Sequence, residues 1–99
     1  MSHWLLWYDL APDYLERRPA VRAAHLDHAR AAAAAGTLLL GGALTEPADT
    51  ALLLFAGDGP EAAEAFARAD PYVSEGLVTH WRVRRWMTVA GPLAAEPVP

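Results

Sequence analysis

The segment TLLLGGALTEPADTALLLFA, residues 37–56, determines the fold expected of this chain. It holds two apolar runs, 37–44 and 50–56, which are separated by the turn-forming segment 46–49. Apolar runs of this length, bounded by Gly, Pro and Asp, are typical of buried strands. A connection this short joins neighbouring antiparallel strands. The segment therefore predicts a strand pair at the centre of the chain.

Helices are predicted on both sides of this strand pair. Before it, the Ala-rich stretch 19–35 strongly favours a helix, and Gly36 follows where a left-handed C-terminal cap is expected. Pro19 either kinks a helix that begins near residue 14 or starts a second helix itself. After the strand pair, a helix is predicted from residue 60 or 61 to 69, and Asp70-Pro71 ends it. A loop is then predicted through residues 72–76.

Two further strands are predicted near the ends of the chain, at 3–9 and 77–86. The resulting order is strand, helix, strand, strand, helix, strand. This is the order of a ferredoxin-like α+β domain, a βαββαβ antiparallel sheet with both helices on one face. We assign residues 1–88 to this domain and residues 89–99 to a C-terminal tail.

The other face of the predicted sheet needs a cover. A chain of 99 residues has no further helices to supply one, and the Trp residues of the first and last strands add apolar area that a single copy does not easily hide. A second copy of the same sheet is the simplest cover. We therefore expect a homodimer.

The composition narrows the possible functions. The net charge is -4, all eight basic residues are Arg, and there is no Cys. Schiff bases on Lys, thiolate nucleophiles, disulfides and Cys-ligated metals are therefore excluded. The absence of a basic cluster argues against nucleic acid as a partner. No apolar stretch reaches the roughly 20 residues that span a bilayer, and no signal peptide is evident. We therefore expect a cytoplasmic protein without a membrane or nucleic-acid partner.

His25 is the strongest candidate for acid-base chemistry. At about 100° per residue, His25 lies on the inner face of the first helix, whereas Asp27 projects outward and cannot orient it. Asp70 is the alternative carboxylate, because a negative charge at the end of a helix calls for a nearby donor or cation. An imidazole from His25 meets that need. The competing interpretation is an Asp-Pro turn with a solvated carboxylate.

Four short motifs, taken in order and with their spacing, resemble those of a known family. They are Arg22-x-x-His25-Leu26, Ala35-Gly36-x-Leu38-Leu39-x-Gly41-Gly42, Glu61-Ala62 leading to Phe66, and Ala69-Asp70-Pro71-Tyr72-x-x-x-Gly76-Leu77. Together they resemble the YciI-like family of small bacterial proteins, from the first strand to Trp86. The resemblance implies a dimeric ferredoxin-like α+β barrel similar to that of muconolactone isomerase. It also implies an active site made by a His-Asp pair, at His25 and Asp70, and one known activity in the family removes hydrogen chloride from a chlorinated hydroxyquinol.

A His-Asp pair of this kind predicts proton transfer without a cofactor. The expected reaction is elimination or isomerisation of a small aromatic or enol-like metabolite. Three residues are candidates for binding the substrate: Arg22 for an anionic group, Gly42 for close approach of the backbone, and Tyr72 for a substrate oxygen. Each has a structural alternative, namely an ion pair, a bulge and a packed ring. The alternative function is a non-catalytic dimeric module that binds a small molecule or accompanies a larger enzyme.

No metal site is expected. His25 and His28 are three residues apart on the predicted helix, but their directions differ by about 60° and no ligand beyond Asp70 is evident. We therefore place His28 at the edge of the helix face. His80 shares one face of the last strand with Arg82, and we expect it to be exposed or to face a partner subunit.

Overall fold

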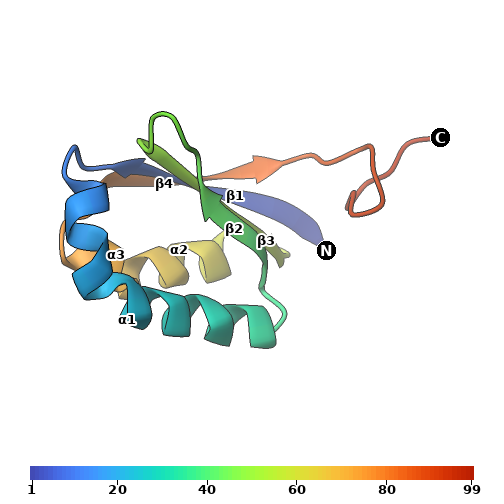
Figure 1. Cartoon of the computed structure of the whole chain (residues 1–99). Helices are drawn as coiled ribbons and strands as arrows, with labels where there is room; N and C mark the ends of the chain where they lie inside the picture. Colours follow the sequence, from blue (N-terminus) through green and yellow to red (C-terminus); the bar gives the residue numbers. More distant parts are fainter.

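A four-stranded antiparallel sheet with helices on one face makes up the computed structural model, which describes all of residues 1–99 (Figure 1). The elements in chain order are β1 (Ser2–Leu10), α1 (Tyr14–Ala34), β2 (Leu38–Ala43), β3 (Thr50–Gly57), α2 (Glu61–Ala69), α3 (Pro71–Ser74) and β4 (Val78–Trp86). The strand order is β2-β3-β1-β4, and every neighbouring pair is antiparallel. The predicted ferredoxin-like α+β fold is confirmed.

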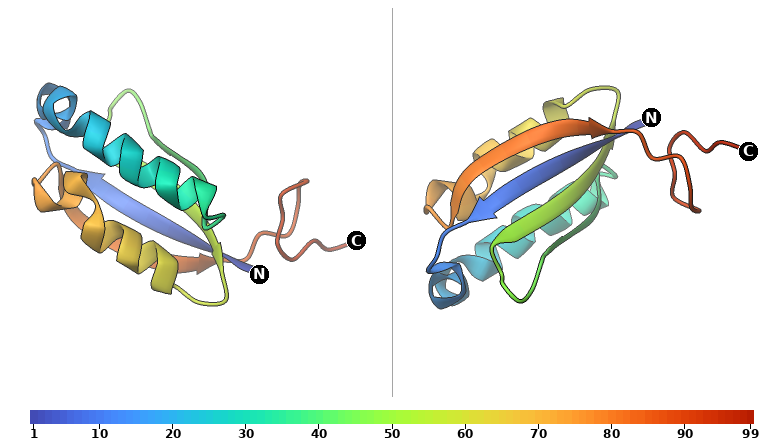
Figure 2. Two further views of the ribbon diagram at one scale, coloured as in Figure 1. Left: turned by 90° about the horizontal axis from the view of Figure 1, so that it is seen from below. Right: turned by 90° about the horizontal axis from the view of Figure 1, so that it is seen from above.

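Helix α1 is a single helix of 21 residues that contains Pro19. Proline has no N–H to donate to the preceding turn, so a helix that continues through it bends. Figure 2 shows the first turn of α1 lying at an angle to the rest of the helix. Of the two alternatives for Pro19, the kink is therefore correct. Gly36 follows the helix with a φ of 82°, which is the left-handed conformation predicted for it.

The short helix α3 occupies a segment that was predicted to be a loop. Helix α2 does end at Ala69, as expected from Asp70-Pro71. Pro71 is nevertheless well suited to the first position of a helix, and the Oδ1 atom of Asp70 accepts the backbone N–H of Tyr72 at 3.0 Å. The loop prediction was wrong because Asp70 ends one helix and caps the next.

The hydrophobic core lies between the sheet and the helices. Along β1, the alternating residues Leu6, Tyr8 and Leu10 are buried on this side, as the two-residue period of a strand requires. Phe55 of β3 meets Phe66 of α2 with their ring centroids 5.3 Å apart. These contacts fix α2 on the sheet and so set the position of the residues that follow it.

The opposite side of the sheet, here called the open sheet face, carries no helix (Figure 1). Strand register places Leu40 beside Leu54 and Leu5 beside both Leu54 and Arg84. Leu40 and Trp86 are 66% and 49% exposed. The face is defined by Leu5, Trp7, Leu40, Leu52, Leu54, Arg82, Arg84 and Trp86.

The C-terminal segment after β4 extends away from the domain and then folds back on itself (Figure 2). The Thr88 hydroxyl lies 2.8 Å from Nδ1 of His3 and accepts the N–H of Ala95 at 2.8 Å. Arg85 and Glu96 form an ion pair across the same loop. These contacts tie the segment to both strands of the β1–β4 pair. No helix of the structure has the length and apolarity needed to cross a bilayer.

Candidate functional site

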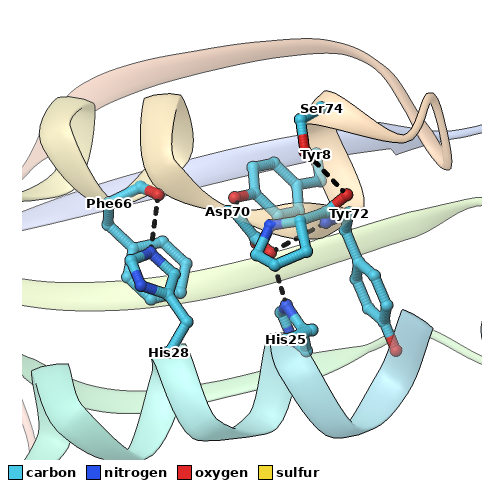
Figure 3. A network of polar contacts seen from close by, with 8 residues as sticks. Tyr8, His25, His28, Phe66, Asp70, Tyr72 and Ser74 are labelled. Atoms are coloured by element: carbon cyan, nitrogen blue, oxygen red, sulfur yellow. Dashed lines mark hydrogen bonds and ion pairs between the residues drawn. The ribbon is translucent and has the colours of Figure 1, made fainter.

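His25 of α1 and Asp70 at the α2–α3 junction meet directly (Figure 3). The Nδ1 atom of His25 lies 2.8 Å from Oδ1 of Asp70, and the two side chains are 15% and 0% exposed. An ionised carboxylate only accepts hydrogen bonds, so Nδ1 carries a hydrogen and donates a hydrogen bond to Asp70. The Nε2 atom is then the free acceptor. It is not buried and contacts no protein donor, so it is available to a ligand.

Asp70 accepts hydrogen bonds from three parts of the chain. Besides His25, the backbone N–H of Tyr72 reaches Oδ1 at 3.0 Å and the hydroxyl of Tyr8 reaches Oδ2 at 2.7 Å. Burial, together with the adjacent Asp70 carboxylate, raises the pKa of Tyr8 above its usual range, so the hydroxyl keeps its proton and donates. Three donors compensate the cost of burying this carboxylate and fix its position.

Tyr8 was missed by the sequence analysis. It lies between Leu6 and Leu10 on a strand of aromatic and aliphatic residues, and nothing in that pattern separates it from ordinary core residues. The available signal was its hydroxyl, because a Tyr in the middle of a buried strand requires a hydrogen-bond partner. That signal predicts a partner but does not say which residue supplies it.

Tyr72 packs flat against His25, with ring centroids 3.8 Å apart and planes 4° apart. The ring of Tyr14 meets Tyr72 edge-on at 5.7 Å. Burial, reinforced by the neighbouring Tyr14, raises the pKa of Tyr72 to about 12, against the opposing effect of Arg22 and Arg18. The stacked ring holds the imidazole plane, so Tyr72 both packs and lines the site.

A cavity of about 220 Å³ opens beside this pair. Its lining consists of Tyr14, Arg18, Arg22, His25, Leu26, Ala29, Leu38, Gly41, Gly42, Ala43, Ala51, Leu53 and Tyr72. The lining includes Arg22, Gly42 and Tyr72, the three residues predicted to bind substrate. We refer to it below as the His25 cavity.

The two glycines of β2 differ in their surroundings. A Cβ atom on Gly41 would lie 3.3 Å from Cγ of Leu53, whereas nothing lies within 4 Å of one on Gly42. Gly42 pairs with Leu52 in the sheet, so a side chain there would point to the open sheet face. Close packing against Leu53 therefore explains why a glycine stands at position 41, whereas a small side chain at position 42 would meet no other atom.

His28 has a separate environment (Figure 3). Its Nε2 atom lies 2.9 Å from the carbonyl oxygen of Phe66, and its ring stacks on the Phe66 ring at 4.3 Å. It ties α1 to α2 at the edge of the helix face. No three His, Asp or Glu side chains lie together as a metal-binding group. His80, whose side chain is 68% exposed, lies 3.6 Å from Asp9 on the open side of the sheet.

Residues 1–87 match the family described as the YCII-related domain. This chain belongs to the YCII-related domain family. The family resemblance seen in the sequence motifs is thereby confirmed. No curated protein sequence matches this YCII-related domain.

Several solved structures share the fold of this YCII-related domain. The 5-chloro-2-hydroxyhydroquinone dehydrochlorinase of Burkholderia phenoliruptrix, in complex with 2,5-dihydroxybenzoquinone, superposes with a TM-score of 0.72 at 21% identity, over 87% of this chain and 94% of that chain. A NIPSNAP family protein of Agrobacterium tumefaciens gives 0.59 at 13% identity, over 92% and 96% of the two chains. A further protein from Agrobacterium tumefaciens gives 0.58 at 10% identity, over 96% and 98%. At these identities the similarity establishes the fold alone.

Proposed function

We propose that this YCII-related domain is a cofactor-free lyase or isomerase that acts on a small aromatic or enol-like metabolite. The observation that carries the proposal is the 2.8 Å contact between His25 Nδ1 and the fully buried Asp70 carboxylate, with Nε2 left free. A base is useful when it is held in one orientation and in one tautomer, and this contact provides both.

His25 acts as the base and Asp70 as its positioning residue. The Nε2 atom takes a proton from a substrate hydroxyl or from a carbon beside a carbonyl, and the electron pair of the broken bond moves into the substrate. In an elimination, that pair expels a leaving group, which departs as an anion. In an isomerisation, the imidazolium returns the proton to another carbon. Asp70 stabilises the imidazolium that His25 becomes when Nε2 takes up the proton.

The comparison with solved structures supports this reaction class. The relative with the TM-score of 0.72 is named for removing hydrogen chloride from a chlorinated hydroxyquinol, and its structure holds a dihydroxybenzoquinone. A shared fold hosts many activities, so the relative guides the choice of test substrates and does not supply the natural one.

The test is chloride release from 5-chloro-2-hydroxyhydroquinone and from a panel of related phenols and enols that carry a leaving group. His25→Asn removes Nε2 and retains an N–H where Nδ1 meets Asp70. We expect this variant to lose about 10²–10⁴-fold in kcat. His28→Gln is the matched control, since it keeps an N–H for the Phe66 carbonyl on the same helix, outside the His25 cavity.

Turnover by His25→Asn at the wild-type rate would refute the role of His25 as the base. A wild-type protein that binds panel members in the His25 cavity but converts none of them would instead support the alternative, a non-catalytic binding module. The cavity itself favours some ligand in either case.

We also propose that a second copy of the chain covers the open sheet face. Six of the eight residues that define this face are apolar, and a groove of about 580 Å³ runs between it and the C-terminal segment. Exposed apolar patches of this kind are rare on monomers. A twofold axis places the same patch of the two copies against each other, so an apolar patch meets an apolar patch.

A further inference from the structure

Two arginines at one end of the His25 cavity have no carboxylate partner. Arg18 and Arg22 both line the cavity, one helical turn apart on α1. The other arginines of this helix, Arg17 and Arg30, lie 3.9 Å and 3.8 Å from Asp13 and Asp27. None of the ion pairs in the structure involves Arg18 or Arg22.

The cavity changes in polarity along α1. Its lining includes Arg18 and Arg22 first, then His25, and then Leu26 and Ala29. With a rise of about 1.5 Å per residue, His25 lies about 4.5 Å along the helix axis from Arg22, on the way to the apolar end. No Asp or Glu side chain lines the cavity. One end therefore carries the two positive charges, beside the rings of Tyr14 and Tyr72, and the end beyond His25 is lined by apolar side chains such as Leu26 and Ala29.

The size of the cavity limits the ligand to a small molecule. An apolar cavity of about 150 Å³ in another protein holds benzene. The His25 cavity, at about 220 Å³, has room for one ring or a short enol with a few substituents. A single ring held by the arginines can also reach His25, because His25 lies only about 4.5 Å further along the helix axis from Arg22.

We propose that Arg18 and Arg22 together bind a carboxylate of the substrate, so that the substrate is a single-ring or enol-type acid with its reactive hydroxyl or C–H at His25. This deepens the proposed function and rests on it for the reaction, although the binding of the carboxylate does not depend on turnover. Arg18 adds a binding residue beside Arg22, and the pair sets the direction in which the substrate lies.

Guanidinium chemistry fits this role. Arg presents several N–H donors in a plane and binds a carboxylate through two parallel hydrogen bonds. Two such groups, one turn apart, can share the two oxygens of one carboxylate. The positive charges of both arginines also oppose the rise in the pKa of Tyr72, so they lie close enough to influence the ring that stacks on His25. Arg18 lies 5.6 Å from the centre of the Tyr14 ring, within the range of a cation–π attraction.

The test compares two probes of nearly the same size and shape, salicylate and its neutral amide salicylamide, in which an NH2 donor replaces one carboxylate oxygen. Binding is followed by NMR chemical shifts of the cavity residues. In the wild-type protein we expect salicylate to bind at least about tenfold more tightly than salicylamide, since hydrogen bonds to charged groups are the stronger ones. The double variant Arg18→Gln with Arg22→Gln should bring this ratio close to one. Arg30→Gln is the matched control, because Arg30 lies on the same helix outside the cavity.

Each outcome decides the proposal. A ratio near one in the wild-type protein, a ratio that survives in the double variant, or no binding of either probe up to its solubility limit would overturn it. Salt that weakens salicylate but leaves salicylamide unchanged supports it. The two proposals are separated by His25→Asn: if that variant keeps the wild-type preference for salicylate, the arginine site stands whether or not His25 proves to be the catalytic base.

Discussion

At the scale of single residues, Asp70 connects the elements that form the site, because its carboxylate accepts hydrogen bonds from α1, β1 and α3. Its carboxylate accepts from the imidazole of His25, from the Tyr8 hydroxyl and from the backbone of Tyr72. The first contact serves the proposed chemistry, and the other two hold the carboxylate in place. Changes around Asp70 are therefore expected to affect both stability and activity, which unfolding experiments and kinetics measure separately.

Asp70→Asn is expected to lower stability by about 1–3 kcal/mol, because an amide of the same shape keeps some of the three contacts but not the charge. On an active substrate, kcat is expected to fall by about 10²-fold or more, since the imidazolium loses its anion. Urea unfolding and steady-state kinetics measure the two effects. A variant with wild-type kcat would show that Asp70 serves folding alone.

Tyr8→Phe is expected to cost about 1–3 kcal/mol of stability, because Oδ2 of the buried Asp70 loses its donor. The same change made in the Asp70→Asn background should cost less, since the charge that needed the hydroxyl is gone. A double-mutant cycle on the free energy of unfolding measures this coupling. Equal costs in both backgrounds would mean that the hydroxyl and the carboxylate do not stabilise each other.

Alkaline pH is expected to destabilise the fold through Tyr72. An unfolded Tyr ionises near pH 10, whereas burial raises the pKa of Tyr72 to about 12 in the folded chain. The contribution of Tyr72 is therefore complete below about pH 10 and is lost as the pH rises towards 12. Urea midpoints taken across this range should fall more steeply for the wild type than for Tyr72→Phe. Parallel slopes would contradict the assignment.

At the scale of elements, the sequence predicted the βαββαβ order and the inward direction of His25. Short apolar and aromatic runs that end in turn residues indicated the strands, the Ala-rich run indicated α1, and helical periodicity placed His25 on the inner face of α1. The α2–α3 junction did not follow, because Asp-Pro is equally suited to ending a helix and to starting one. The partner of Tyr8 lies 62 residues away, and no local pattern encodes such a contact.

The end of α1 offers a test at this scale. Gly36 has a φ of 82°, and no atom lies within 4 Å of where its Cβ would be, so Gly36→Ala suffers from backbone strain alone. We expect a loss of about 1 kcal/mol. Gly42→Ala, which has equal room and no positive φ, is the control and should cost less. Thermal or urea unfolding compares the two, and equal losses would place the cost elsewhere.

At the scale of the whole molecule, the sheet divides the chain into two sides with different roles. The helical side holds the His25 cavity, and the open sheet face holds the apolar surface proposed to pair with a second copy. Strand β2 borders both sides, because Gly41 and Gly42 line the cavity and the groove alike. The proposed dimer interface and the proposed ligand site thus lie on opposite sides of the same sheet.

Leu40→Arg is expected to convert the proposed dimer to a monomer, because it places a charge within the apolar surface that is proposed to pair. Leu40 is 66% exposed in the single chain, so the change should leave the fold intact. Leu15→Arg is the matched control, since Leu15 is 54% exposed and lies on α1, away from the open sheet face. Sedimentation velocity measures the mass in solution. A monomeric wild type, or a Leu40→Arg variant that stays dimeric, would refute the proposed pairing.

The placement of the tryptophans has a practical consequence. All four lie on β1 and β4, and none lines the His25 cavity. Trp7 and Trp86 belong to the open sheet face, whereas Trp4 and Trp81 pack against the core. The emission of the unmodified protein should therefore change on dilution, as copies separate, and stay constant when a colourless ligand enters the cavity. The tryptophans are thus expected to report the proposed pairing of two copies by fluorescence, independently of whether a ligand occupies the His25 cavity.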